Sequence, residues 1–134
     1  MLIAYLPQAA AVWTVCCSDD AEADSPVFAH QSRWQQHILM KYGQTVCLVD
    51  ATYNTTVYEM PLFMLCVMTN VGYVVVATFL LPDKQAASIK TALRLVKKWS
   101  PAWQPTYIMS DFCEAQISAF ADVFPGQLEY IIVL

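Results

Sequence analysis

The sequence predicts one α/β domain built around a mixed central sheet, and three observations predict it. The chain has 134 residues, which is enough for one domain but short for two. Hydrophobic residues make up 57% of the chain and charged residues only 13%, a balance that suits a sheet covered by helices. Short apolar runs alternate with segments of helical period, which is the pattern of strands connected by helices.

The first predicted element is a helix over residues 25–42. Ser25 stands where an N-cap belongs, and Pro26 follows at the first helical position, where its missing N–H costs nothing. Gly43 is placed to end the helix in a left-handed conformation. The apolar stripe of this helix consists of Trp34, Ile38 and Tyr42.

Residues 1–24 are expected to form a poorly ordered leader ahead of a domain over residues 25–134. The leader begins with an apolar run and ends in a cluster of acids between Asp19 and Asp24. The run lacks a basic start and is broken by Pro7, so a cleaved secretory signal is the less favoured interpretation. No stretch of the chain has the ~20 apolar residues of a membrane-spanning helix. Secretion as a small α/β binding module remains one alternative.

Five apolar runs predict the strands. The second and third flank Asn70-Val71-Gly72, a hairpin signal, and an amphipathic helix follows from Pro82. If that helix makes a right-handed crossover, the fourth run lies parallel to the first, and the five-stranded mixed sheet has the order 3-2-1-4-5. A shorter helix over residues 112–123 precedes the last run. The five runs cover residues 45–50, 61–69, 73–81, 106–110 and 128–134.

Two carboxylates end strands that this topology makes neighbours. Asp50 follows the first run and Asp111 follows the fourth, so both emerge at the same edge, on backbones ~4.8 Å apart. Carboxylate oxygens suit Mg²⁺ or Mn²⁺, and paired ions of this kind catalyse phosphodiester displacement. The two aspartates are therefore the candidate catalytic and metal-binding residues.

Each aspartate also has a purely structural interpretation. Asp111 could be the N-cap of the next helix, with Glu114 three residues later completing a capping-box-like pattern. Asp50 could be satisfied by a hydrogen bond from Thr52 or by a backbone turn. The residues alone leave these alternatives open.

The cationic residues are the weaker candidate site. The chain has a net charge of −4, which argues against a strongly basic nucleic-acid binder. Lys90, Arg94, Lys97 and Lys98 fall on one face of the second helix and could meet a phosphate backbone, although such a face is usually just solvated. His30 and His37 are expected near one another on the first helix, with no third ligand in sight. The five cysteines include no C-x-x-C pair, and Cys47 and Cys66 are expected to be buried thiols.

Several motifs, taken in order, resemble the RNase H-like domain of Mutator-like transposases. The similarity is closer to the domesticated form in animal SWIM-type zinc-finger proteins, and it covers about residues 27–127. The motifs are Trp34-Gln35 through Tyr42-Gly43, Leu48-Val49-Asp50-Ala51-Thr52-Tyr53, Pro61-Leu62-Phe63, Thr69-Asn70-Val71-Gly72-Tyr73 and Met109-Ser110-Asp111-Phe112.

The resemblance implies an RNase H-like fold in which Asp50 and Asp111 are the first two acids of a metal-binding triad. The family's third acid is a glutamate on a helix beyond the fifth strand, whereas this sequence ends at Leu134, so we expect a C-terminally truncated domain. Glu129, at the start of an apolar run, is a poor substitute. The expected function is a domesticated, non-catalytic nuclear domain that associates with DNA or with protein. The alternative is a fragment of an active Mg²⁺-dependent DNA strand-transferase or nuclease.

Overall fold

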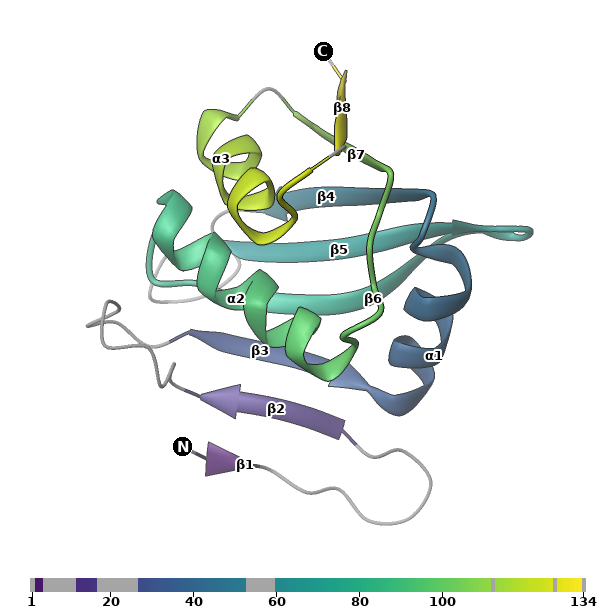
Figure 1. Cartoon of the computed structure of the whole chain (residues 1–134). Coiled ribbons are helices and arrows are strands. Elements are labelled where there is room, and N and C mark those ends of the chain that lie inside the picture. Colours follow the sequence, from purple (N-terminus) through teal and green to yellow (C-terminus); the bar gives the residue numbers. More distant parts are fainter. Residues whose placement is uncertain are drawn as a thin grey trace.

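The structure is a computed structural model that describes residues 2–3, 12–16, 27–52, 60–111, 113–126 and 128–133. The described strands belong to one mixed sheet, and the helices pack beside it (Figure 1). The elements, in chain order, are β1 (Leu2–Ile3), β2 (Val12–Cys16), β3 (Phe28–Ser32), α1 (Arg33–Tyr42), β4 (Val46–Thr52), β5 (Leu62–Thr69), β6 (Gly72–Leu80), α2 (Ala86–Trp99), β7 (Tyr107–Asp111), α3 (Glu114–Val123) and β8 (Glu129–Val133).

The sheet has the order β1-β2-β3-β6-β5-β4-β7-β8. The five predicted strands are β6, β5, β4, β7 and β8, and they lie next to one another in the predicted succession. The prediction of a five-stranded sheet is nevertheless wrong, because β3, β2 and β1 continue the sheet beyond β6. As predicted, β4 and β5 are antiparallel, whereas β4 and β7 are parallel.

The segment before α1 is a strand, so the predicted helix over residues 25–42 is wrong in its first part. Strand β3 pairs antiparallel with β6, and the buried Gln31 donates from Nε2 to the carbonyl oxygen of Val76 over 3.0 Å. The helix begins only after Ser32, whose Oγ accepts from the backbone N–H of Gln35 while the Gln35 side chain accepts from Ser32 N. This capping box supplies the helix start that we had assigned to residues 25 and 26, which lie outside the described residues.

The strands β1 and β2 fall within residues 1–24, for which we expected poor order. Strand β2 pairs antiparallel with β3, from Val12 opposite Ser32 to Cys16 opposite Phe28. The wrong helix prediction hid this possibility, because a helix over residues 28–32 would leave β2 no strand to pair with. The acidic cluster between positions 19 and 24 lies outside the described residues.

Gly43 ends α1 as predicted, but for a different reason. Its φ of −81° and ψ of 0° are right-handed, so the left-handed conformation that we predicted is wrong. A Cβ at this position would lie 2.5 Å from the carbonyl oxygen of Leu39 and 2.6 Å from Leu39 Cδ1. Glycine is therefore needed for the close approach of the helix end to Leu39.

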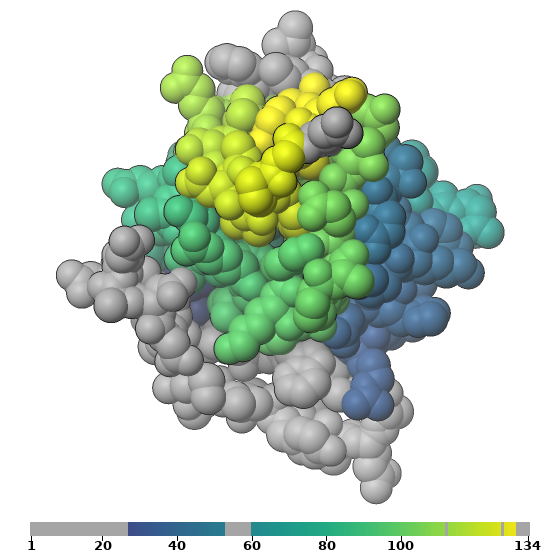
Figure 2. Space-filling view, in the orientation of Figure 1, coloured from purple at the N-terminus to yellow at the C-terminus, as the bar shows by residue number. Residues whose placement is uncertain are grey.

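Helices α2 and α3 cover one face of the sheet, the face turned toward the viewer in Figure 1. In the space-filling view of Figure 2, their green and yellow-green atoms conceal most of the central strands. Side chains from this face of the sheet join those of the helices in one core, in which Ile89, Leu93 and Val96 of α2 are buried as their spacing predicts. The buried side chains of β4 and β7 in this core are Cys47, Val49 and Ile108.

Candidate functional site

Asp50 and Asp111 lie at the same edge of the sheet, as the sequence predicts. The parallel pairing runs from Val46 opposite Tyr107 to Leu48 opposite Met109, and each strand carries its aspartate two residues beyond the last pair. Both side chains are exposed. Asp50 and Asp111 are therefore the two residues that would hold a shared cation at this edge of the sheet.

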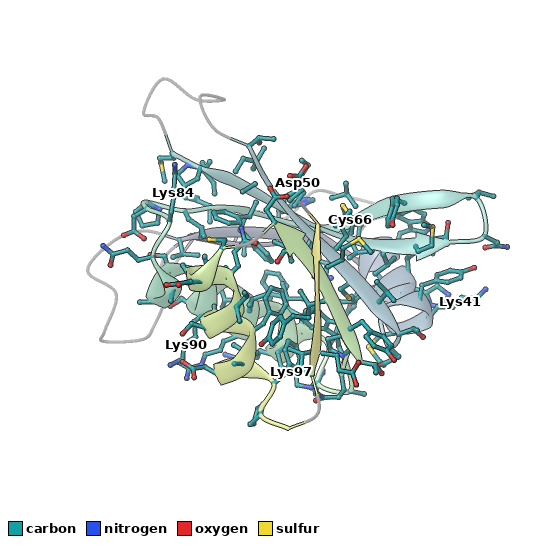
Figure 3. The ribbon with its side chains drawn as sticks, turned by 90° about the horizontal axis from the view of Figure 1, so that it is seen from above. Lys41, Asp50, Cys66, Lys84, Lys90 and Lys97 are labelled. Carbon is teal, nitrogen blue, oxygen red and sulfur yellow. The ribbon has the colours of Figure 1, made fainter. Side chains whose placement is uncertain are left out.

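Both aspartates project from the sheet face that is opposite α2 and α3, which we call the aspartate face. Side chains alternate along a strand, so Asp50 shares its face with Leu48 and not with the buried Cys47 and Val49. Leu48 is the cross-strand partner of Cys66. Figure 3 shows Asp50 and Cys66 on this side of the sheet, with Lys90 and Lys97 on the other.

Cys66 is an electrostatic neighbour of Asp50 that the sequence did not reveal. Burial raises the pKa of the Cys66 thiol, and the negative charge of Asp50 raises this pKa further. Cys47, as predicted, is a buried thiol, and its burial raises its pKa to about 12. The proximity of Cys66 follows from the antiparallel register of β4 and β5, for which neither residue carries a local signal.

The structure contradicts the helix-cap interpretation of Asp111 and the hydrogen bond from Thr52 to Asp50. A backbone turn after Asp50 would involve residues 53–59, which lie outside the described residues. Helix α3 begins at Glu114 and its N-cap is Cys113, so Asp111 is the last residue of β7 and not a helix cap. Thr52 donates from Oγ1 to the carbonyl oxygen of Leu62 over 3.3 Å, and so it does not serve Asp50. Asp50 is solvated, and it needs no buried partner.

Glu129 lies at the far end of β8 from this edge. It is level with Tyr107, whereas Asp111 is level with Val133, four residues farther along the strand. At about 3.3 Å per residue, Glu129 is therefore roughly 13 Å from the level of the aspartates. Within the described ranges, no group of three or more histidine, cysteine, aspartate or glutamate side chains could hold a metal ion.

The chemistry of the two aspartates suits a hard divalent cation. Mg²⁺ prefers octahedral oxygen ligands and is commonly bound by one or two carboxylates, with water completing its coordination shell. Asp50 and Asp111 would supply those carboxylates, and their exposure leaves room for the water. A bound ion would supply charge neutralisation at this edge.

The four cationic residues of α2 do not form one uniform basic surface. Lys90 forms an ion pair of 3.3 Å with Asp122 of α3. Lys97 donates to the carbonyl oxygen of Trp103, lies 5.3 Å from the ring centre of Phe124, and has its pKa lowered by burial. Arg94 and Lys98 are exposed. Lys90 and Lys97 therefore contact other parts of the protein. Binding of nucleic acid by all four residues stays a prediction.

The two histidines lie in different elements. His30 is part of β3, whereas His37 is exposed on α1, so the expectation that both lie on one helix is wrong. The helix prediction over residues 25–42 caused this error.

Among the helices that the structure describes, none is long and apolar enough to cross a membrane.

Comparison with known proteins identifies the family. Residues 6–128 match the family described as "Zinc finger SWIM domain-containing protein 1/3, RNaseH-like domain". A segment of the PKS-NRPS hybrid synthetase cheA of Chaetomium globosum is 30% identical over 82 residues, which are 58% of this chain but only 2% of the synthetase. No solved structure matches the chain. The family match covers nearly the whole chain, from before β2 to the start of β8, and the mixed sheet with its flanking helices agrees with it. The chain belongs to the family of RNase H-like domains of zinc finger SWIM domain-containing proteins.

Proposed function

We propose that this chain is a transposase-derived RNase H-like domain that acts in the nucleus as an interaction domain, and that its aspartate pair holds one divalent cation without cutting nucleic acid. The observation that carries the proposal is the placement of Asp50 and Asp111 at one edge and on one face of two adjacent parallel strands. Membership of the zinc finger SWIM domain-containing family supports the nuclear role.

The charge at the aspartate edge supports one ion and not two. Two-metal catalysis of phosphoryl transfer needs ions about 3.5–4 Å apart that clamp both the attacking and the leaving oxygen. Two such ions carry four positive charges, and the aspartate pair offsets two of them. Glu129, the next acid in the chain after Asp122, is held at the opposite end of β8. The pair therefore favours binding over cleavage.

A second candidate is a fragment of an active Mg²⁺-dependent strand-transferase or nuclease. One observation favours it: both aspartates are exposed at the position where the resemblance places catalytic acids. In that case the remaining acid would have to come from outside the pair. The two candidates differ in one measurable property, which is cleavage of DNA.

A plasmid assay separates the two candidates. The full chain is incubated with supercoiled plasmid and Mg²⁺ or Mn²⁺, beside the variants Asp50→Asn, Asp111→Asn and Glu129→Gln. We expect no nicking by the wild type above that of the two aspartate variants. If the wild type and Glu129→Gln nick the plasmid and both aspartate variants do not, the chain is a nuclease and the proposal of a non-cutting domain is wrong.

Fractionation of cells that express the tagged chain tests the nuclear role. Exclusion of the chain from the nuclear fraction would refute it.

A further inference from the structure

A shallow groove of about 390 Å³ lies between α1 and the segment that follows α2. Helix α1 contributes Arg33, His37 and Met40 to it. Trp99 at the end of α2 and Ser100 and Ala102 in the segment that follows form the other wall. In Figure 2 the blue atoms of α1 lie beside the green atoms of the segment that follows α2. The side chain of Gln36 donates to the carbonyl oxygen of Trp99 and ties the two walls together.

The lining of the groove is mainly apolar, and its rim is cationic. Arg33, His37 and Lys41 are exposed and follow one another at intervals of four residues, so they share one face of α1. Neither α1 nor residues 97–106 contain an aspartate or a glutamate. Among the described residues, neither Arg33 nor Lys41 forms an ion pair. Within the part of the chain that the structure describes, the rim therefore presents the positive charges of Arg33 and Lys41 without a paired acid. The net charge of the whole chain is −4.

Ser100 adds an unused hydrogen-bonding group to the groove. Its side chain is 3% exposed, and its Oγ has no hydrogen-bond partner among the residues that the structure describes. A buried hydroxyl without a partner costs roughly 1–3 kcal/mol relative to one that is satisfied. A backbone amide or carbonyl of a chain lying in the groove would supply the partner after a small adjustment of the wall.

We infer that this groove binds an acidic peptide segment of a partner protein, with one apolar side chain seated against Met40 and Trp99 and with flanking carboxylates on Arg33 and His37. A small molecule fits less well, because small-molecule pockets enclose about 70–90% of their ligand and this groove is open. Nucleic acid also fits less well, because phosphates are bound mainly by clustered Lys and Arg and cannot use an apolar floor. The inference deepens the proposed interaction role but uses neither aspartate of the pair.

A random dodecapeptide phage library tests the inference on the full chain. The library is selected on the wild type and counter-selected on Ala102→Glu, which places a negative charge in the groove. The control is Ala121→Glu, the same substitution at an exposed position of α3. We expect the enriched peptides to carry acidic residues around an aromatic or aliphatic one. Circular dichroism verifies that both variants are folded.

Synthetic copies of the enriched peptides, labelled with fluorescein, then give affinities by anisotropy. Ala102→Glu and Arg33→Glu should each weaken binding by about tenfold or more, which corresponds to about 1.4 kcal/mol, while Ala121→Glu should leave it within about twofold. The inference fails if no acidic–apolar peptide is enriched or if Ala102→Glu binds as the wild type does. It also fails if a single-stranded oligonucleotide binds more tightly than the peptides and loses affinity in Ala102→Glu. Asp50→Asn should bind these peptides normally, so failure here is distinguishable from failure of the cation site.

Discussion

The indole Nε1 of Trp103 donates a hydrogen bond of 3.2 Å to the carbonyl oxygen of Gly43. The thiol of Cys47 donates to the same oxygen over 3.3 Å, so one carbonyl joins the end of α1, the start of β4 and the segment before β7. Two residues after Gly43, the carbonyl oxygen of Thr45 accepts a hydrogen bond of 2.8 Å from the backbone N–H of Tyr107. These contacts help to fix the parallel register of β4 and β7, and each strand carries its aspartate two residues beyond the last pair of that register.

Replacing Gly43 with alanine should destabilise the protein by about 1–3 kcal/mol, because a Cβ there overlaps the carbonyl oxygen and the side chain of Leu39. Urea denaturation measures the change. Gly43→Asn gives a second test, since asparagine tolerates a left-handed conformation but not a close approach, and should be no more stable than Gly43→Ala. Recovery of stability in the asparagine variant would show that backbone conformation, and not contact with Leu39, requires the glycine.

Ser32→Ala should lower the free energy of unfolding by about 1 kcal/mol, because it removes the acceptor of the capping box at the start of α1. The matched control is Ser25→Ala, which replaces the residue that the local Ser25-Pro26 pattern predicts as the cap. Thermal unfolding of the two variants compares the alternatives directly. A larger loss of stability in Ser25→Ala than in Ser32→Ala would place the helix start at residues 25 and 26.

The sequence predicts the strands and helices from Val46 onward well, because each has its own period and its own turn residues. It fails between positions 25 and 42, where two sets of helix-start residues compete. Ser25-Pro26 satisfies local preferences, but Ser32 and Gln35 form the actual capping box, because β3 gains hydrogen bonds from β6 and from the Gln31 side chain. Those partners are more than forty residues away, and no local pattern reports them.

The parts of the candidate site that the sequence predicts are likewise those that depend on local patterns. Asp50 and Asp111 each end an apolar run, so parallel pairing alone places them at one edge. The approach of Cys66 to Asp50 depends on the register between β4 and β5, and the groove beside α1 depends on how the segment after α2 packs. Register and packing are set by the whole fold, and neither has a sequence motif.

Asp50→Asn should speed the alkylation of Cys66. The negative charge of Asp50 contributes to the raised pKa of this thiol, so its removal lowers the pKa and increases the thiolate fraction at any pH below it. Iodoacetamide labelling followed by peptide mass spectrometry, over a series of pH values above 8, measures the rate at each cysteine. Cys47, with a pKa raised to about 12, should stay slow in both proteins and serves as the internal control. An unchanged Cys66 rate in Asp50→Asn would show that the two groups do not interact.

Binding of a divalent cation should stabilise the folded state, because an ion that binds only the native protein adds its binding free energy to that of folding. Mg²⁺ or Mn²⁺ should therefore raise the melting temperature of the wild type. Asp50→Asn and Asp111→Asn should each abolish the increase, while Glu129→Gln, the amide substitution at the far end of β8, should retain it. If the rise in melting temperature is lost in all three variants alike, it reflects the negative charge of the protein in general and not a cation site at Asp50 and Asp111.

The most direct test of the aspartate pair is a Mn²⁺ titration of the full chain followed by electron paramagnetic resonance, which counts the ions that remain free. The predicted result is one bound ion per chain in the wild type and in Glu129→Gln, and none at the same concentrations in Asp50→Asn or Asp111→Asn. Two bound ions per wild-type chain, or one that persists in both aspartate variants, would contradict a single cation held between Asp50 and Asp111.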